Sequence, residues 1–597
     1  MNLHELSKEE LIKFIEENEN TTGKYGLTWD KEKEPEETVV NCSKNISILS
    51  EKEEMNIMNN SDDITNVLIS GDNFHSLSVL NYTHKEKIDI IYIDPPYNTG
   101  NKDFIYNDKF VVQEDGYRHS KWLNFMSKRI RLARDLLKET GTIFISIDDN
   151  EQAQLKLLCD KVFGSINCLG ILPTIMNLKG NQDQFGFAGT HEYTLAYAKN
   201  KSLCELGQFN IDDDEIEKEW EQDEIGYFKK GATLRATGVD SDREKRPYMF
   251  YPVLIKNDEV SMITEEEYSK IYDSSSKEFD DNYLDNLVSK YSSEGYDVLL
   301  PKNPNGTYGR WRWGFQSMIN NKNEIIINNT NGISLYKKQR PTIGDIPTKK
   351  PKSLLYKAEY SSGNGTSQLE KILGSKKFDN PKPVELIKDL IRIGSQNKDS
   401  LVLDFFAGSG TTGQAVMELN KEDGGNRKFI LCTNNENNIF DEVTYPRLKT
   451  VITGVRTDGS KYSNGLDFNL KVYETAFVEN SNNRDQLYFD LTERCIPMLC
   501  MKSECFEEYK SSDEYKIYVN KDKTRYACVY YSLFGEKEEE FIEELRNIKE
   551  EKYLYKFTLG DTPDMTKYKD LTNYEVEAIP YKIVELYKKI VKMSRED

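Results

Sequence analysis

Runs of apolar residues alternate with amphipathic stretches in two separate parts of the chain. The β-branched run at 88–93, with similar runs at 66–70 and 142–147, predicts strands that are covered on both faces. Between the strands at 88–93 and 142–147, apolar residues recur at helical spacing up to Gly141, which is predicted to end that helix. Strands that alternate with helices predict an α/β domain with a parallel sheet.

The alternation stops near residue 170 and returns near residue 371. Helices are predicted at 383–394, 411–421 and 443–454, with strands at 400–406 and 428–435 between them. Another helix is predicted at 7–18, from capping-box spacing. We therefore predict five segments: a helical and irregular extension (1–64), the first half of an α/β domain (65–170), an insertion (171–370), the second half (371–464) and a C-terminal α+β domain (465–597).

Composition limits the class of protein. With 80 Lys and Arg against 101 Asp and Glu, the net charge is −21, which argues only weakly against nucleic acid because local patches decide binding. Nine cysteines, an odd number without a CxxC motif, favour buried free thiols in a reducing compartment. No signal peptide or membrane span is found in the sequence, so a soluble cytoplasmic protein is expected.

Two polar motifs follow predicted strands, at the sheet edge where doubly wound folds bind ligands. The first is Asp94-Pro95-Pro96-Tyr97. The second runs from Asp404 through Gly408 and Gly410 into a helix, where Thr411 and Thr412 are predicted to cap. The glycines match the dinucleotide pattern G-x-G-x-x-G, but that match does not separate NAD from another nucleoside cofactor.

Together, "DPPY" and the later "DFFAGSG" resemble the S-adenosylmethionine-dependent amino-methyltransferases of DNA. The catalytic motif precedes the glycines by 310 residues (from Asp94 to Asp404), an order that resembles the beta class of adenine-N6 methyltransferases. An ordered set that includes "KYGLTWD", "SKWLNFMSKRIRLARDLL", "HEYTLAYAKN", "GRWRWGF" and "FDNPKPVELIKDLI" further resembles the modification subunit of type III restriction–modification systems. The resemblance implies a Rossmann-like sheet with circularly permuted motifs, an inserted α+β target-recognition domain and a C-terminal domain for dimer or partner docking.

The resemblance also implies roles for the first motif. Asp94 would accept one hydrogen of the adenine N6 amino group and the Pro95 carbonyl the other, so that the nitrogen lone pair turns toward the methyl group. Pro96 would stiffen the turn, and Tyr97 would stack on a base flipped out of the duplex.

For S-adenosylmethionine, the resemblance implies a cofactor site built from the second motif and its neighbours. Asp404 is expected to order the glycine turn, and Asn434 and Asn435 compete with Glu436 for the ribose hydroxyls. The candidates are Asp72, Asn73, Lys382, Pro383, Asp404, Phe406, Gly408, Gly410 and Glu436.

DNA contacts are expected mainly in the insertion, where a basic run at 337–357 and the mixed arginine and aromatic run at 308–315 suit phosphate and base contacts. The tryptophans of the second run could equally be core residues. The candidates are Arg310, Arg312, Trp313, Lys337, Lys338, Arg340, Lys349, Lys350 and Lys352.

No His/Asp/Glu cluster for a metal and no phosphate-binding G-x-x-x-x-G-K-[ST] motif are found in the sequence. If the resemblance holds, nuclease and helicase activities belong to a partner restriction subunit, and a homodimer is expected. Alternatives are cytosine-N4 methylation, which the aspartate of "DPPY" disfavours, methylation of RNA or of a protein glutamine, and a DNA-recognition subunit with vestigial activity.

Overall fold

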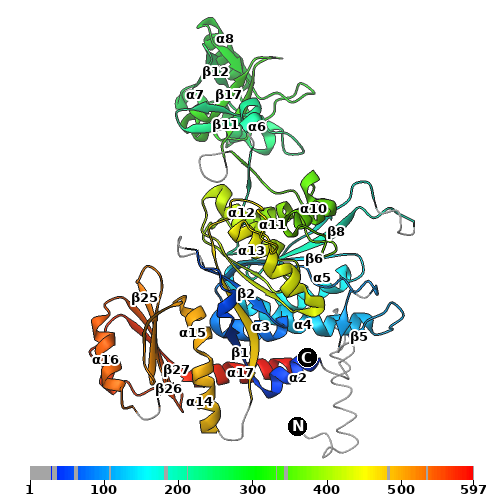
Figure 1. The fold of residues 1–597 in the computed structure, drawn as a ribbon. Coiled ribbons are helices and arrows are strands. Elements are labelled where there is room, and N and C mark those ends of the chain that lie inside the picture. Colours follow the sequence, from blue (N-terminus) through cyan, green and yellow to red (C-terminus); the bar gives the residue numbers. More distant parts are fainter. Residues whose placement is uncertain are drawn as a thin grey trace, which may run out of the picture. The chain divides into compact units, whose positions relative to one another are not determined.

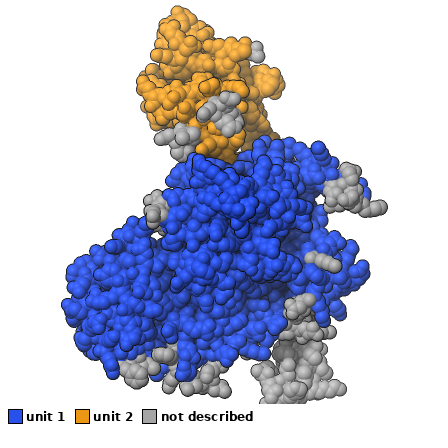
Figure 2. Space-filling view, viewed as in Figure 1, with its two compact units in different colours: residues 1–207, 352–597 blue, residues 208–351 orange. Residues whose placement is uncertain are grey.

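The computed structural model describes residues 29, 36–59, 65–101, 103–106, 109–180, 186–211, 213–330, 332–341, 347–479, 484–532 and 535–595. The chain divides into two compact units (Figure 2): unit 1 comprises residues 1–207 and 352–597, and unit 2 comprises residues 208–351. The helix predicted at 7–18 lies outside the described residues. Among the described helices, none combines the length and the apolar character needed to cross a bilayer.

A nine-stranded sheet organises unit 1, and its six central strands, from β22 to β6, run parallel. The parallel strands are the apolar runs of the sequence, as expected for strands covered on both faces. In spatial order the strands are β1 (Ile46–Glu51), β22 (Asn469–Val478), β2 (Thr65–Ser70), β21 (Lys428–Thr433), β20 (Leu401–Asp404), β3 (Ile88–Ile93), β6 (Leu137–Ile147), β8 (His191–Ala198) and β7 (Cys168–Ile175).

Helices cover both faces of this sheet (Figure 1). The helices of one group share a core with Ile91 and Ile93 of β3: α3 (Asn73–Thr83), α4 (Arg118–Leu136) and α5 (Gln152–Phe163). On the other face, Gly394 lies so close to Ile90 and Phe144 that an added Cβ would meet them at 3.2 and 2.9 Å. This second group comprises α10 (Ser362–Leu373), α11 (Val384–Gly394), α12 (Thr411–Asp423) and α13 (Tyr445–Thr453).

Four predicted segment boundaries need correction. The insertion was expected to end at 370, but unit 2 ends at residue 351, and helix α10, which begins at Ser362, belongs to unit 1. The insertion was expected to begin at 171, but β7 and β8 extend the nine-stranded sheet beyond β6 by antiparallel pairing. Residues 1–64 were expected to be helical or irregular, yet β1 pairs with β22 after helix α2 (Glu37–Lys44). Since β22 also belongs to this sheet, the C-terminal segment begins after residue 478 rather than at 465. The outer strands β1, β7 and β8 are mixed in composition, so their apolar pattern is weak.

The helix predicted to run to Gly141 ends at Leu136 instead, and β6 begins at the next residue. Gly141 lies inside β6, where an added Cβ would stand 3.0 Å from the Ile88 carbonyl oxygen. The glycine therefore serves close backbone approach between β6 and β3, and it does not terminate a helix.

The C-terminal part of unit 1 carries a second, five-stranded sheet. The elements are α14 (Arg484–Arg494), α15 (Ile496–Ser503), β23 (Glu507–Ser511), β24 (Tyr515–Val519), β25 (Arg525–Tyr530), α16 (Glu538–Asn547), β26 (Glu551–Thr558), β27 (Tyr574–Pro580) and α17 (Tyr581–Arg595). Three of the helices, α14, α15 and α17, contribute side chains to the same apolar core as α3 and α4, whereas α16 packs in a separate core. Tyr82 of α3 donates a hydrogen bond of 2.6 Å to Glu577.

Unit 2 has its own core around Trp311, which is 2% exposed. Its two main sheets are β10 (Glu221–Asp223), β11 (Gly226–Thr233), β18 (Ser334–Gln339) and β17 (Ile325–Asn328), and β13 (Glu259–Met262), β12 (Val253–Lys256) and β16 (Asp297–Leu299). Short pairs join β14 (Tyr272–Asp273) to β15 (Glu278–Phe279) and β9 (Phe209–Asn210) to β19 (Thr348–Lys349). Its helices are α6 (Asp213–Glu219), α7 (Glu265–Ser269), α8 (Asp281–Ser293) and α9 (Phe315–Asn320).

The centre of the sheet offers a test of this architecture. Ile91 of β3 is fully buried and pairs with Leu403 on one side and Ile143 on the other. We expect Ile91→Ala to lower the free energy of unfolding by about 2–5 kcal/mol, through lost burial and the cavity that remains. Urea denaturation would measure it, with the exposed Leu203→Ala as control. Equal effects of the two substitutions would contradict the placement of β3 at the sheet centre.

Candidate active site

A cavity of about 550 Å³ opens at the carboxyl edge of the parallel sheet, within the usual size of ligand sites. Four adjacent strands, β2, β21, β20 and β3, end beside it. Its wall also includes the short pair β4 (Ile105–Tyr106) and β5 (Lys109–Phe110). The predicted residues that line the cavity come from both halves of the domain: Asp72, Asn73, Asp94, Pro95, Pro96, Phe406, Gly408 and Glu436.

Asp94 follows β3 directly, and its side chain is 28% exposed. Its Oδ1 accepts a hydrogen bond from the Tyr97 hydroxyl at 2.9 Å and lies 3.1 Å from the Lys382 ammonium. Oδ2 accepts no hydrogen bond from any described residue. One carboxylate oxygen is thus anchored, and the other remains available to a ligand.

A tryptophan indole restrains the turn that contains Pro95 and Pro96 through one hydrogen bond. Trp122 of α4 is fully buried, and its Nε1 donates a hydrogen bond of 2.7 Å to the Pro96 carbonyl. This contact fixes the turn from outside the cavity. No local sequence pattern indicates this hydrogen bond, which is a finding of the structure.

Lys382 does not line the cavity, contrary to its expected place beside the cofactor. Its ammonium donates to the Tyr97 hydroxyl at 2.7 Å and to Glu192 at 3.1 Å, besides its contact with Asp94. Burial alone would lower the pKa of Lys382, but Asp94 and Glu192 raise it above its usual value. Pro383, the residue before α11, also lies outside the cavity lining.

The Tyr97 hydroxyl lies among the groups that surround the Lys382 ammonium, and it contacts Asp94 and Glu192 as well. Burial, with Asp94 and Glu192 nearby, raises the pKa of Tyr97 well above its usual value, so the hydroxyl stays protonated. The Lys382 ammonium also lies 5.0 Å from the ring centroid. The stacking role expected of the ring stays a prediction, whereas the hydroxyl contacts were not anticipated.

Asp404, one of the candidates for the cofactor site, is buried and lies outside the cavity lining. Its Oδ1 accepts from the Phe406 amide at 3.0 Å and its Oδ2 from the Thr412 hydroxyl at 2.6 Å. Burial raises the pKa of Asp404 to about 7, against the effect of these two donors.

The expectation that Thr411 and Thr412 cap helix α12 was wrong. The residue before the helix is Gly410, which has φ of 79° and no side chain to cap with. Thr412 instead donates to Asp404, and Thr411 accepts a hydrogen bond of 2.7 Å from the buried Arg447. Gly408, with φ of 47°, is the glycine of the turn that lines the cavity.

Asp72 both caps a helix and lines the cavity. Its Oδ1 accepts from the Phe74 and His75 amides of α3 at 2.7 and 3.3 Å. Beside it, Asn73 accepts a hydrogen bond of 2.5 Å from the fully buried Arg129. Sequence reasoning missed Arg129, because its pairing partner across the fold is Glu36, which precedes α2.

The candidates that follow β21 divide between the cavity and the turn. Asn434 and Glu436 line the cavity, and their side chains approach to 3.4 Å. Asn435 instead donates to Asp441 at 2.7 Å and accepts from the Phe440 amide at 3.1 Å. Of the three candidates for a ribose contact, Asn435 is thus committed to the turn.

Acidic side chains of unit 2 neutralise part of the positive charge of the basic run at 337–357. Arg340 and Lys338 both pair with Asp223, at 2.9 and 2.6 Å, and Arg340 also pairs with Glu324. Lys337 and Lys350 are exposed, and Lys349 is exposed on β19. Lys352, also exposed, lies just outside unit 2 in sequence.

The arginine and aromatic run is partly core. Trp311 is buried, and Trp313 packs against the same core while its carbonyl accepts from Tyr251 at 2.7 Å. Arg310 donates to the Asp240 carbonyl at 2.6 Å, and the exposed Arg312 donates to Thr237 at 3.0 Å. Arg312 thus presents the more accessible guanidinium of the two.

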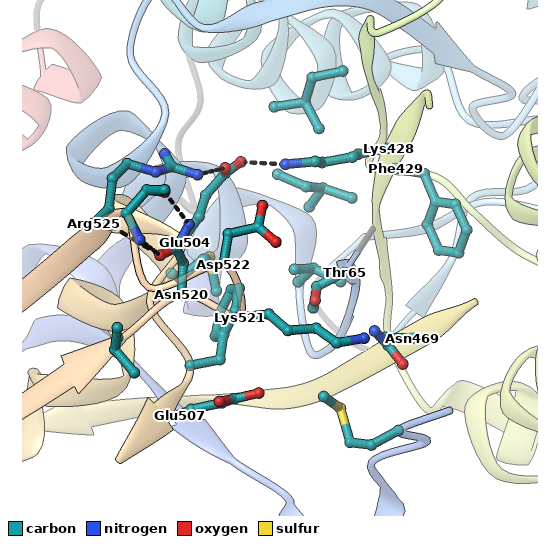
Figure 3. A pocket seen from close by; sticks show the side chains of 18 of the residues that line it. Thr65, Lys428, Phe429, Asn469, Glu504, Glu507, Asn520, Lys521, Asp522 and Arg525 are labelled. Carbon is teal, nitrogen blue, oxygen red and sulfur yellow. Dashed lines mark hydrogen bonds and ion pairs between the residues drawn. The ribbon is translucent and has the colours of Figure 1, made fainter. Parts of the chain in front are cut away.

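A second cavity, of about 180 Å³, lies at the opposite, amino-terminal edge of the sheet (Figure 3). Glu504 there accepts from Lys428 at 2.9 Å and Arg525 at 3.0 Å. Burial would raise the pKa of Glu504, but these two cations lower it to about 2. The cavity lies where the C-terminal sheet meets the central sheet, and it is smaller than usual ligand sites.

The sequence model of a family described as DNA methylase matches residues 88–440. The type III restriction-modification enzyme EcoPI Mod subunit of Escherichia phage P1 is 45% identical over 415 residues, which cover 65% of this chain and 60% of that protein. The chain thus spans less than two thirds of that relative's length. The type II methyltransferase M.KpnI of Klebsiella pneumoniae is 32% identical over 375 residues, 63% of this chain and 82% of that protein.

Solved structures give a weaker likeness. The PvuII DNA methyltransferase (cytosine-N4-specific) is 11% identical and covers 63% of this chain and 86% of its own, with a TM-score of 0.29. A score of this size carries no argument about the fold, which rests here on the strand order itself.

The raised pKa of Asp404 predicts a pH dependence. The folded state holds the Asp404 proton up to about pH 7, whereas the unfolded state loses it near the ordinary value of 3.8. Between these values wild-type stability should fall as pH rises, by up to about 1.4 kcal/mol per pH unit from this group. Asp404→Asn, which keeps an acceptor for the Phe406 amide, should lack that component. Thermal unfolding of both proteins from pH 4 to pH 8 would measure this component. Identical slopes of stability against pH in the two proteins would contradict the raised pKa of Asp404.

Proposed function

The chain belongs to the DNA methylase family, and on that premise we propose that it transfers a methyl group from S-adenosylmethionine to N6 of an adenine flipped out of double-stranded DNA. We propose further that it is the modification and recognition subunit of a type III restriction–modification system. The observation that carries the proposal is that Asp94 and the glycine turn at Phe406 and Gly408 line one cavity, although the two motifs are about three hundred residues apart in the sequence.

The residues of the cavity suit S-adenosylmethionine. Gly408 lets the backbone approach a ligand closely, and Phe406 presents an apolar ring for the methionine part. Asp72, Asn73 and Glu436 supply polar groups for the nucleoside part. When bound, the cofactor supplies a methyl group on a sulfonium, which is a good leaving group.

Catalysis then depends on how this chain positions the amine. The free oxygen of Asp94 accepts one N6 hydrogen, and the Pro95 carbonyl, held in a turn that Trp122 fixes, accepts the other. Both contacts turn the nitrogen lone pair toward the methyl group for in-line attack. The negative charge of Asp94 also favours the positive charge that develops on nitrogen.

The remaining assignments follow from the same proposal. Unit 2 is the target-recognition domain, and its exposed Lys337, Lys349, Lys350 and Arg312 contact DNA. Two copies of the chain form a dimer, and a separate restriction subunit with helicase and nuclease activity binds to it. The cytoplasm, where the DNA of a bacterial cell lies, is the proposed location.

The reaction is tested by incubating the purified chain with labelled S-adenosylmethionine and duplex DNA, and digesting the product to nucleosides. We expect N6-methyladenine, whereas N4-methylcytosine or an absence of labelled DNA would refute the proposal. Asp94→Ala should slow methyl transfer by at least about a hundredfold while S-adenosylmethionine still binds. Asp399→Ala, an exposed aspartate before β20, is the matched control and should leave the rate unchanged.

The DNA-binding role of unit 2 is tested through salt dependence. Lys337→Ala combined with Lys350→Ala removes two exposed charges for which the described residues offer no ion-pair partner. The slope of log K against log salt should become shallower by about 2, with similar losses on specific and non-specific DNA. The control removes two exposed lysines of the C-terminal region, Lys523→Ala with Lys588→Ala. An equal change in that control would refute the assignment.

A further inference from the structure

Glu192 carries a buried carboxylate that contacts Tyr97 of the catalytic motif and also Lys382. It lies on β8, two strands from the Asp94 strand β3, and its side chain is 12% exposed. Its Oε2 accepts hydrogen bonds from Lys382 and from the Tyr97 hydroxyl, both at 3.1 Å. Its Oε1 is buried and has no hydrogen-bond partner among the described residues. This carboxylate therefore depends on Lys382 and Tyr97.

Lys382 shares one positive charge between two carboxylates. Its ammonium is 3.1 Å from Asp94 Oδ1 and 3.1 Å from Glu192 Oε2. The three groups together carry a net charge of −1 when ionised. Removal of either carboxylate would still leave the buried cation one partner, which avoids an unpaired buried charge.

The Tyr97 hydroxyl has a similar choice of partners. It accepts from Lys382 at 2.7 Å, and it has a single hydrogen to donate. Two carboxylate oxygens lie within reach of that hydrogen, Asp94 Oδ1 at 2.9 Å and Glu192 Oε2 at 3.1 Å. The hydrogen bond can therefore pass from one carboxylate to the other by rotation of the hydroxyl alone.

Building on the proposed methyl transfer, we infer that Glu192 is a positioning residue for the reaction. Acting through Lys382 and Tyr97, it holds Oδ1 of Asp94 in place before transfer, and it retains both donors when Asp94 becomes neutral. The N–C bond forms as the S–C bond breaks, and the N6 amine then loses one proton to the Asp94 carboxylate. Lys382 stays paired with Glu192 through that step, and Tyr97 donates to Glu192.

The surroundings of Glu192 predict a pH dependence of the rate. The titratable groups that face it are Asp94, Tyr97 and Tyr92 from β3 and the turn after it, and Lys382 from the turn before α11. Burial raises the pKa of Glu192, with Lys382 opposing and Asp94 reinforcing that rise. Because the ionised form holds Lys382, the rate should fall on the acid side at a pH above the ordinary carboxyl range.

Glu192→Gln tests the inference, since it keeps the shape of the side chain and removes its charge. We expect kcat for DNA methylation to fall by about tenfold to a hundredfold. KM for DNA and the Kd for S-adenosylmethionine should stay near wild type, because Glu192 does not line the cavity. The acid limb of the pH–rate profile should also flatten. Glu205→Gln, an exposed glutamate soon after β8, is the control and should change none of these values.

A double-variant cycle separates action through Lys382 from an independent structural role. If Glu192 acts through Lys382, then Glu192→Gln combined with Lys382→Met should be little slower than Lys382→Met alone. Losses that multiply in the double variant would overturn the inference. So would a wild-type kcat for Glu192→Gln.

Two outcomes keep this inference distinct from the proposed function. A wild-type chain that methylates no DNA refutes the function itself, whereas an active wild type with an equally active Glu192→Gln refutes only the role of Glu192. If the thermal transition of Glu192→Gln shows that it does not fold, Glu192→Asp is measured in its place. That variant keeps the charge but shortens the reach to Lys382, and a wild-type kcat for it would overturn the inference.

Discussion

The parallel pairing of β3 with β20 is the contact on which the candidate site depends. Val402 and Leu403 of β20 lie in register with Ile90 and Ile91 of β3, so both strands end at the same edge of the sheet. Each strand then delivers its motif to that edge, Asp94 from one and the glycine turn after Asp404 from the other. Because parallel neighbours must be joined by long crossovers, the chain between them has room for β6, β7, β8 and all of unit 2.

Charge at this edge is balanced by groups that come from distant segments. Lys382 lies between Asp94 and Glu192, and Arg129 lies between Glu36 and the helix-capping Asp72. Each buried cation thus has two carboxylate partners. Of the partners of Lys382, only Asp94 lines the cavity, whereas both partners of Arg129 line it. Such an arrangement keeps each cation paired when one lining carboxylate engages a ligand, and it orients that carboxylate beforehand.

Local sequence patterns predicted the central strands and the helices between them well, because strands buried on both faces are nearly continuous apolar runs. The outer strands β1, β7 and β8 were harder to assign. Their membership in the sheet is set by the pairing of β1 with β22, of β8 with β6 and of β7 with β8, and not by their own composition. The basic run at 337–357 shows the same limit, since Asp223 and Glu324 meet Lys338 and Arg340 only in the folded unit 2.

The sequence by itself determined the two motifs, their order and the kind of strand that carries each one. It determined these because strand ends, prolines and glycines act over a few residues. Only the tertiary structure decided that Lys382 contacts Asp94 outside the cofactor cavity, that Trp122 holds the Pro96 carbonyl, and that Glu192 belongs to the site. Hydrogen bonds and ion pairs of this kind join residues tens to hundreds of positions apart. Their partners are selected by the register and packing of the sheet, which no short stretch of sequence contains.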